Sequence, residues 1–400
     1  MRRLPFTFYV LVQIAFLFVH YPTTRRFPRI LSFACLLALL FYCYTEYSLQ
    51  SSGEDYVLGC SNGILLVTAV HTTFFCPDFP DRLKRAGFMN KPSELPFAQK
   101  LSWMTELAGN MRRIGFTRDD GAMNSATVDL NINKRDPASS GARRRFVISR
   151  VILSVLCLVV FYSTLLHRLQ KPSFNPALHK SAHDGRFIRA DSSLLGRFWE
   201  VTVWTAGTVS EMTFLHSTAA ALSVGVGAFQ PEDWPPMFGS PTHAYSVRTF
   251  WSKSWHQILR VPLGRSGAHF AQNVLNLDKG TSGFMTVQSI TAFFLSALIH
   301  TGGDYAIHRN FGRSGPTFQF FLLQPVAILI EEIAIRGTRC VLLSTRVRVR
   351  IPGLAWRGVG YLWVCLWFVW CAPPWLDTIS AAGGNVRTRL IPLKMLEKLA

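Results

Sequence analysis

Long apolar stretches separated by polar connections run along most of the chain. A helix that crosses a bilayer needs about 20 mostly apolar residues, and the candidates are 4–20, 30–45, 56–75, 146–166, 284–300, 318–335 and 358–375. A further stretch, 198–229, is apolar but contains Glu200, Glu211 and His216. Because lipid cannot satisfy open backbone groups, each stretch is expected to be helical. The pattern predicts an all-α, polytopic bundle of about eight spans, with interfacial helices between them.

The composition excludes several protein classes. Hydrophobic residues make up 49% of the 400 residues and charged residues only 16%, whereas soluble domains carry about 25% charged residues. This argues against disorder and against a soluble enzyme. The net charge of +19 could suggest a nucleic-acid partner. We expect none, because the basic residues lie between apolar runs, where they would face the cytosol and anionic headgroups.

The loops suggest a three-part organisation. Residues 1–75 are predicted to form N-terminal transmembrane helices, 76–145 a flexible basic cytosolic loop without a fold of its own, and 146–400 the functional core. The basic loops 21–29, 76–145 and 336–357 fall on one side of an eight-span topology, as the positive-inside rule expects. The basic segment 167–197 falls on the other side, which leaves the span count around 167–229 open.

No metal site or resident cofactor is predicted. The eight cysteines include no C-x-x-C pair, and most lie inside apolar runs. A thiol in such a place behaves as a small buried hydrophobe.

The segment 246–260 is the first that could carry chemistry. At 100° per residue, one stripe is apolar and its neighbour holds Ser252, His256 and Arg260. We expect one amphipathic helix that ends at Pro262, lies at the membrane interface and has its apolar stripe formed by Val247, Trp251, Trp255, Ile258 and Leu259. Periodicity alone also fits a helix that only anchors the chain at the interface. In that interpretation His256 is an ordinary polar residue without a role in chemistry.

The second segment, 284–300, is an apolar helix that ends at His300. Ser296, Ala292 and Ser289 form a stripe of small residues behind this histidine, which lets a helix or ligand approach closely. An ionisable group at membrane depth is a functional candidate, although a packing or headgroup-level histidine is the other interpretation. The sequence Thr301–Asp304, with two glycines, is predicted to break the helix.

Together these segments resemble the wax-synthase-like branch of the membrane-bound O-acyltransferase superfamily. That branch carries R-x-F-W-x-x-x-W-H-Q and, about forty residues later, a helix reading F-x-x-S-x-x-x-H. Here the patterns are Arg248-Thr249-Phe250-Trp251-Ser252-Lys253-Ser254-Trp255-His256-Gln257 and Phe293 through Ser296 to His300. The two histidines are 44 residues apart, and Ala297 stands where the family often has Gly.

The resemblance implies acyl transfer from acyl-CoA to an alcohol, with His300 as the catalytic histidine and His256 as the second polar residue. A neutral imidazole within about 3 Å of a hydroxyl can take its proton, and the thioester oxyanion needs a donor, for which we favour His256 over Gln257. Residues expected to contact CoA or the acceptor are Arg248, Trp251, Lys253, Trp255, Gln257, Arg260, Arg265 and Ser296.

The expected partners are acetyl-CoA, a hydrophobic alcohol and the bilayer, because fungal members of this size often acetylate terpenoid or meroterpenoid metabolites. Residence in the endoplasmic reticulum is a further expectation from the family. A long-chain-alcohol acyltransferase is the second enzyme hypothesis. A transporter with His300 in a substrate path, or a non-catalytic scaffold, are the alternatives from other classes.

Overall fold

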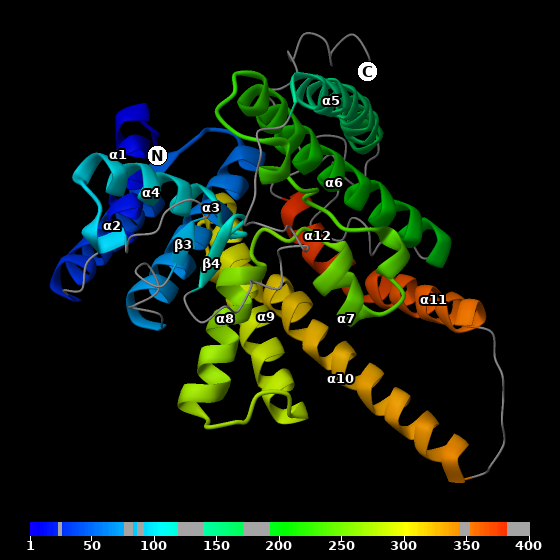
Figure 1. Ribbon diagram of the computed structural model, residues 1–400. Coiled ribbons are helices and arrows are strands. Elements are labelled where there is room, and N and C mark those ends of the chain that lie inside the picture. Colours follow the sequence, from blue (N-terminus) through cyan, green and yellow to red (C-terminus); the bar gives the residue numbers. More distant parts are fainter. Residues whose placement is uncertain are drawn as a thin grey trace. The chain divides into compact units, whose positions relative to one another are not determined.

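The computed structural model describes residues 1–22, 26–75, 83–85, 92–118, 139–170, 193–344 and 353–381. Its structure is almost entirely helical (Figure 1). The α-helices are α1 Phe6–Val19, α2 Arg26–Glu46, α3 Ser52–Val70, α4 Phe97–Gly109, α5 Ser140–Gln170, α6 Leu194–Gly225, α7 Val247–Thr249, α8 Arg260–His269, α9 Ser282–His308, α10 Gly315–Ser344, α11 Gly353–Cys371 and α12 Pro373–Ala381.

Short elements complete the description. Two two-stranded pairs are formed by β1 Arg2–Arg3 with β2 Tyr47–Ser48 and by β3 Leu83–Arg85 with β4 Phe116–Arg118. One-turn π-helices are η1 His71–Phe75, η5 Phe250–Ser254 and η6 Phe270–Val274, and the 3₁₀ turns are η2 Pro92–Glu94, η3 Pro231–Asp233, η4 Pro241–His243 and η7 Phe311–Ser314.

All eight apolar stretches predicted from the sequence lie on helices. Within the described residues, five helices are long and apolar enough to cross a membrane, and the bent pair α11–α12 makes up to six. Helix α1 is apolar but shorter, with 14 residues. Helix α6, which carries Glu200 and Glu211, is not among the five. The fold class is therefore confirmed as an all-α membrane protein with close to the expected number of spans.

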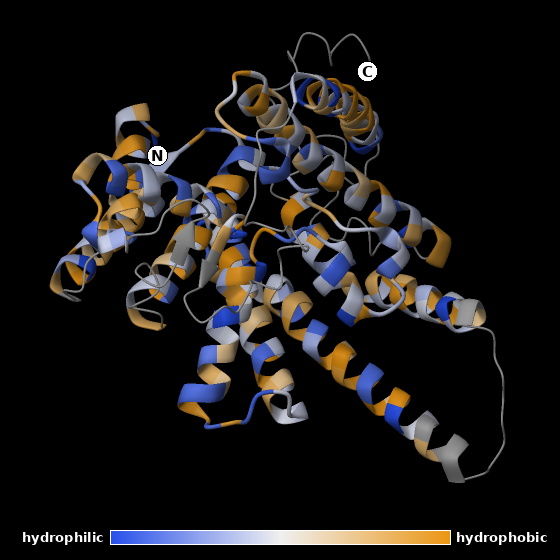
Figure 2. Ribbon diagram, in the orientation of Figure 1, coloured by the Kyte–Doolittle hydropathy of each residue, from blue (hydrophilic) through white to orange (hydrophobic). Residues whose placement is uncertain are grey.

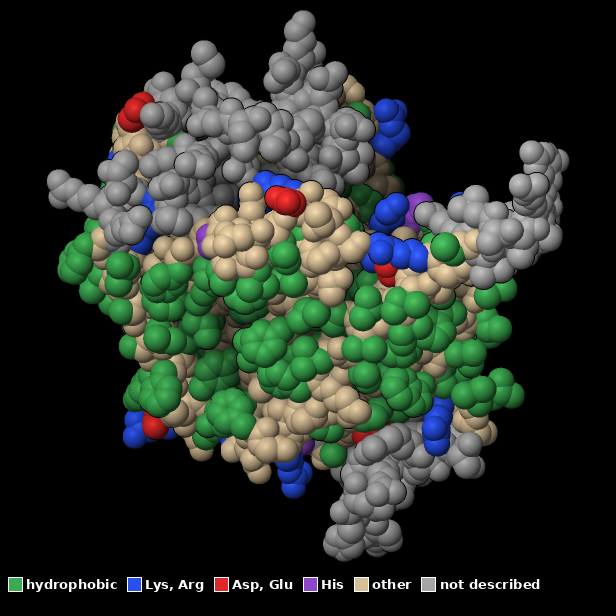
Figure 3. All heavy atoms as spheres, turned by 90° about the horizontal axis from the view of Figure 1, so that it is seen from below, with side chains coloured by type: hydrophobic (Ala, Val, Ile, Leu, Met, Phe, Trp, Pro, Cys, Tyr) green, Lys and Arg blue, Asp and Glu red, His purple; other side chains and the backbone are tan. Residues whose placement is uncertain are grey.

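Many apolar side chains lie on the outside of these helices rather than in a core. Along α5, for example, Ile152, Val155 and Val159 are each more than half exposed. Figure 2 shows hydrophobic residues along the helices, and such exposed side chains cover much of the surface drawn in Figure 3. This distribution suits hydrocarbon as the solvent of these faces, because a soluble monomer rarely exposes large contiguous apolar patches.

The chain divides into two compact units. The first unit consists of residues 1–137, 258–311 and 387–392, and the second of 138–257, 312–386 and 393–400. The described helices of the first unit are α1–α4, α8 and α9. One core of that unit joins α1, α2 and α3 through Val12, Phe16, Val19, Leu36, Leu40, Leu65 and Ala69.

In the first unit, glycines let α3 and α9 approach each other closely. A Cβ atom on Gly59 would overlap the carbonyl oxygen of Gly302, and one on Gly303 would lie 2.6 Å from the Cys60 sulfur. The expected break at Thr301–Asp304 is therefore wrong. Helix α9 continues to His308 and ends at Arg309, whose φ is 53°. These glycines serve helix packing, as small residues do between membrane helices.

Part of the basic segment 76–145 is folded, contrary to our expectation. Helix α4 places Trp103, Met104 and Leu107 in a small core with Leu95 and Phe116. The spacing of these three helical residues puts them on one face, so α4 has an apolar stripe that outweighs the polar composition of the segment. The stretch 119–138 of that segment lies outside the described residues.

The second unit contains α5–α7 and α10–α12. Helices α5 and α6 form an antiparallel pair, in which Arg143 lies beside Val224 and Ser154 bonds Thr218. Helices α10 and α11 pack against the short α7–η5 segment, and α12 packs against α10 (Figure 1). A seam of aromatic rings holds these elements together, formed by Trp204, Phe250, Trp251, Phe320, Phe368 and Trp375.

The predicted single helix over 246–260 is wrong in length. The segment has one α-helical turn, then the π-helix η5, and becomes extended at Trp255. Pro262 does not end a helix but lies in the first turn of α8, where a missing N–H is harmless. The expected face shared by Ser252, His256 and Arg260 is therefore not formed.

Candidate active site

His300 lies in the middle of α9, in the first unit, and its side chain is partly exposed. Ser296 precedes it by one turn and is also partly exposed. Asp304 follows it by one turn and is completely buried. The three residues share a face of α9 because positions four apart lie above one another on a helix.

Helix α3 supplies two partners for the His300 ring. The Tyr56 hydroxyl lies 3.1 Å from Nδ1 of His300, and the Cys60 sulfur lies 3.7 Å from the same atom. Tyr56 and Cys60 are four residues apart, so both project from one face of α3. The close approach of α3 to α9 at Gly59 and Gly303 brings this face to the histidine.

The Tyr56 contact bears on which nitrogen of His300 can act as a base. In a neutral imidazole one nitrogen carries the proton and the other carries the lone pair. If Nδ1–H donates to the Tyr56 oxygen, the lone pair is on Nε2. If Tyr56 donates to Nδ1, the roles are exchanged and Nε2 carries the proton. The arrangement thus couples the Tyr56 hydroxyl to the tautomer of His300.

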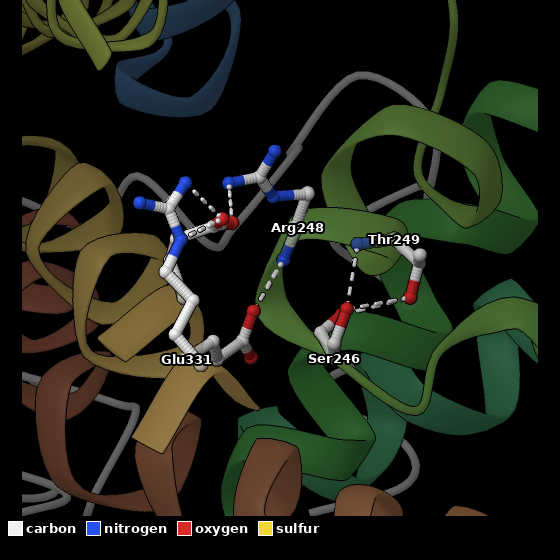
Figure 4. A network of polar contacts seen from close by, with 6 residues as sticks. Ser246, Arg248, Thr249 and Glu331 are labelled. Atoms are coloured by element: carbon white, nitrogen blue, oxygen red, sulfur yellow. Dashed lines mark hydrogen bonds and ion pairs between the residues drawn. The ribbon is translucent and has the colours of Figure 1, made fainter. Parts of the chain in front are cut away.

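The Arg248–Gln257 pattern lies in the second unit, and Glu331 of α10 holds its beginning. The Glu331 carboxylate accepts the backbone N–H of Val247 at 2.5 Å and that of Arg248 at 3.2 Å. Ser246 caps the same turn by accepting the N–H of Thr249 at 3.0 Å. Figure 4 shows the Glu331 carboxylate and the Ser246 hydroxyl aimed at this turn.

The Arg248 guanidinium is part of a three-residue ion pair. Its Nη2 lies 2.9 Å from Glu332, which also pairs with Arg336 at 2.8 Å. Two cations thus share one carboxylate, and the group keeps a net positive charge. Arg248 is expected to contact CoA, so this pairing constrains where its charge can point.

Trp251 and Trp255 are embedded among other rings. The Trp251 indole N–H donates to the Gln324 side-chain oxygen at 3.1 Å. Phe250 stacks on Trp255 with centroids 5.5 Å apart and contacts Phe368 at 4.6 Å. These contacts pack Trp251 against α10 and α11 and Trp255 against Phe250, and the expected contact of the two tryptophans with CoA or the acceptor stays a prediction.

His256 is held at the end of the same segment in a desolvated place. Burial lowers the pKa of its imidazole to about 4, so the ring is neutral near pH 7. Its Nδ1 is buried and has no hydrogen-bond partner among the described residues. The next residue, Gln257, is buried, with 8% of its surface exposed. Its side-chain N–H donates to the Trp255 carbonyl at 2.6 Å.

Helix α8 brings basic side chains near those that follow α4 in the first unit. Burial, and then the charge of Arg265, lowers the pKa of Arg113 to about 9. Burial, and then the charge of Arg260, lowers the pKa of Arg112. Positive charges therefore gather around α8, while Lys253, in the second unit, is exposed.

The predicted site residues fall into two groups. Those of the second unit are Arg248, Trp251, Lys253, Trp255, His256 and Gln257, and those of the first are Arg260, Arg265, Ser296 and His300. Sequence reasoning missed Tyr56, Cys60, Gln324 and Glu331 as neighbours of these groups. Nothing local marks Tyr56, which is 244 positions from His300. Glu331 was missed because a carboxylate on an apolar helix gives no periodic signal that indicates which residue it binds.

Comparison with known proteins identifies the relatives of this chain. Residues 234–323, which contain both patterns, match the membrane bound O-acyl transferase family. The chain is 26% identical to acetyltransferase ple2 of Rhodocybe pseudopiperita over 85% of this chain and 83% of that protein. It is 27% identical to acetyltransferase eriL of Hericium erinaceus, over 94% and 91%. O-Mevalon transferase yanI of Aspergillus niger is 28% identical over 75% and 67%.

No solved structure matches this chain significantly. The match to the family nevertheless spans the two histidines, and the relatives extend along most of the chain. The apolar helices agree with an integral membrane protein. The family match and the acetyltransferase relatives imply an acyl-CoA donor and an acyl acceptor. The region that carries both patterns is therefore similar to the membrane bound O-acyl transferase family, and the chain is an acyltransferase.

Proposed function

We propose that the protein transfers the acetyl group of acetyl-CoA to a hydroxyl of a terpenoid or meroterpenoid secondary metabolite. Relatives that cover most of the chain are named acetyltransferases. The observation that carries the proposal is the His300–Tyr56 pair, in which an imidazole on an apolar helix is held by a hydroxyl at 3.1 Å.

In the proposed reaction, Tyr56 accepts from Nδ1–H of His300, and Nε2 takes the proton of the acceptor hydroxyl. The alkoxide oxygen attacks the thioester carbonyl carbon and forms a tetrahedral oxyanion. The C–S bond then breaks, and the CoA thiolate takes from His300 the proton that came from the acceptor hydroxyl. The products are an acetate ester and CoA, and no covalent enzyme intermediate is needed because the thiolate is a good leaving group.

His256 is proposed as the donor to the oxyanion. A neutral imidazole offers one N–H, and a donor in a desolvated place stabilises developing charge strongly. The low pKa of His256, about 4, supports this role because the ring remains neutral throughout the cycle. Gln257 is the alternative donor, although its amide is already bonded to the Trp255 carbonyl.

The basic side chains around α8 are proposed to meet the phosphates of CoA. Arginine forms strong charge-assisted hydrogen bonds with phosphate oxygens. Arg260 and Arg265 lie near Arg112 and Arg113, so that several guanidinium groups are gathered in the first unit. Arg248 and Lys253 remain proposals for the same task in the second unit.

The decisive experiment is transfer of labelled acetyl from acetyl-CoA in microsomes that contain the protein, with a panel of hydroxylated terpenoids. His300→Ala is expected to abolish transfer, and His256→Ala to reduce it by about 10²-fold or more. The matched control is His243→Ala, because His243 is an exposed histidine outside both patterns. Transfer that survives His300→Ala would remove this residue from the mechanism.

The choice of acyl donor separates acetyl transfer from long-chain transfer. Palmitoyl-CoA added as a competitor should leave acetyl transfer unchanged if the protein prefers the short chain. Preferred use of palmitoyl-CoA with a long-chain alcohol would favour the wax-synthase alternative. Residence in the endoplasmic reticulum is part of the proposal and is tested by co-localisation of a fluorescent fusion with a marker of that membrane.

A further inference from the structure

Two side chains of α10 hold the segment Val247–Gln257 in the second unit, and neither belongs to the recognised pattern. Glu331 binds the beginning of the segment and Gln324 binds its middle. They are seven residues apart on α10, so both project from nearly the same face. Helix α11 meets that face with two tryptophans, Trp363 and Trp367.

Each of the two side chains accepts from the segment and from α11 at once. Glu331 accepts the backbone N–H of Val247 at 2.5 Å and the indole N–H of Trp363 at 2.9 Å. Gln324 accepts the indole N–H groups of Trp251 at 3.1 Å and Trp367 at 3.3 Å through a single oxygen. Glu331 and Gln324 therefore fix the segment to α10 and α11 at two places, near Val247 and at Trp251.

Burial makes the Gln324 contact important. Gln324 is 0% exposed, and its amide nitrogen donates to the Phe320 carbonyl at 2.7 Å. That bond orients the amide so that its oxygen faces both indoles. Trp251 is half-buried, and an indole N–H that loses its acceptor in such a place is left partly desolvated without a hydrogen bond. A side chain without an oxygen at position 324 would therefore drive Trp251 to another position.

The segment cannot hold its own shape. Helix α7 is only three residues long, and the π-helix η5 is a single turn, whereas isolated helices this short are unstable. Its end is tied to its middle, because Gln257 donates to the carbonyls of both Trp251 and Trp255. A displacement of Trp251 is therefore transmitted to His256.

We propose that Gln324 and Glu331 are positioning residues of the acyltransferase site: they set the place of Trp251, and through it the place of His256. This inference rests on the function proposed above, in which His256 acts on the reaction. Neither residue needs to touch a substrate, because each acts through the segment that it holds.

The test compares Gln324→Leu, which has no acceptor, with Gln324→Glu. Because burial favours the protonated acid, Gln324→Glu keeps an oxygen for both indoles and an O–H for the Phe320 carbonyl. Gln324→Leu is expected to lower kcat by about tenfold or more at a nearly unchanged KM for acetyl-CoA, because small displacements of catalytic groups reduce rates strongly. Gln324→Glu should restore most of that loss. Gln319→Leu is the control, since Gln319 is exposed on the same helix, and should match the unchanged protein.

Two further measurements separate positioning from a general loss of folding. In the Trp251→Phe background, Gln324→Leu should have a much smaller effect on kcat, since the indole N–H through which Gln324 acts is gone. The second measurement is amide hydrogen exchange of the detergent-solubilised full chain. The amides of Val247 and Arg248 should exchange faster in Glu331→Ala than in the unchanged protein. In the control Glu232→Gln, which changes an exposed carboxylate, they should exchange at the normal rate.

The outcomes distinguish this inference from the proposed function. If the unchanged protein transfers no acetyl group, the proposed function fails, while faster exchange in Glu331→Ala still supports the anchoring of the segment. If the unchanged protein is active and Gln324→Leu has normal kcat, the positioning role is overturned. It is also overturned if Gln324→Leu has equal effects with and without Trp251.

Discussion

The Tyr56 hydroxyl and Nδ1 of His300 lie 3.1 Å apart, although 244 positions separate the two residues in the chain. Helix α3, which carries neither of the two patterns, thus contacts the histidine of the second pattern on α9. Since only one of the two ring nitrogens can carry the proton of a neutral imidazole, this contact lets Tyr56 affect the tautomer of His300, and through it the proposed role of this histidine as a base.

Tyr56→Phe tests that influence. The substitution keeps the ring and removes only the hydroxyl, so His300 loses a hydrogen bond worth about 1 kcal/mol. We expect kcat to fall by about fivefold, with little change in thermal stability. Steady-state kinetics in microsomes measure the effect, and Tyr361→Phe is a control, since its exposed hydroxyl bonds the Thr242 carbonyl in the second unit. Equal losses in the two variants would argue against a special role for Tyr56.

Gly59→Ala is expected to separate α3 from α9. Its added methyl group would overlap the Gly302 carbonyl, and overpacking of this kind costs about 1–3 kcal/mol. The melting temperature and the acetyl-transfer rate should both fall, because Tyr56 and Cys60 leave His300. Gly337→Ala provides the comparison: its Cβ would meet nothing within 4 Å, so the helix should become slightly more stable. A Gly59→Ala protein with normal melting would disprove the tight packing.

The low pKa of His256 predicts a stability change in acid. The folded ring binds a proton only near pH 4, whereas an unfolded histidine binds one near its ordinary pKa of about 6.5. The contribution of this group is therefore present above pH 6.5 and is lost as the pH falls from 6.5 towards 4. Thermal unfolding of the solubilised protein should show a smaller drop over that window in His256→Asn than in the unchanged protein. A parallel drop in both would mean that His256 is solvated.

The outer arginine of the ion pair is expected to matter little. Arg336 is mostly exposed where it meets Glu332, and exposed pairs contribute about 0–1 kcal/mol. Arg336→Met should therefore retain normal activity and melt within a few degrees of the unchanged protein. Arg248→Met removes the other partner of Glu332 and should reduce activity clearly. Similar activity in the two variants would show that Arg248 has no role beyond that of Arg336.

Patterns along the chain predicted the helices well, because their apolar composition is a local property. All the predicted apolar stretches are helical, and both histidine patterns fall in the region that matches the family. Prediction failed where a distant element decides the outcome. Gly302 and Gly303 suggest a break when considered alone, but α3 packs on them and the helix continues.

The same limit applies to the candidate site. Pro262 indicates the end of a helix as readily as the beginning of one, and only the structure shows that it lies in the first turn of α8. The partners of the patterns were not predictable, because Gln324 and Tyr56 act through single hydrogen bonds to residues far away in the chain. A bond of this kind leaves no periodic trace in the sequence.

The crossing of α3 and α9 has a consequence for dissection of the protein. A fragment that begins after Phe75 would retain every residue of the family match and yet lack Tyr56 and Cys60, which contact His300. Such a fragment should be inactive by itself. Co-expression of residues 1–75 as a separate polypeptide should restore activity when the two pieces associate in the bilayer.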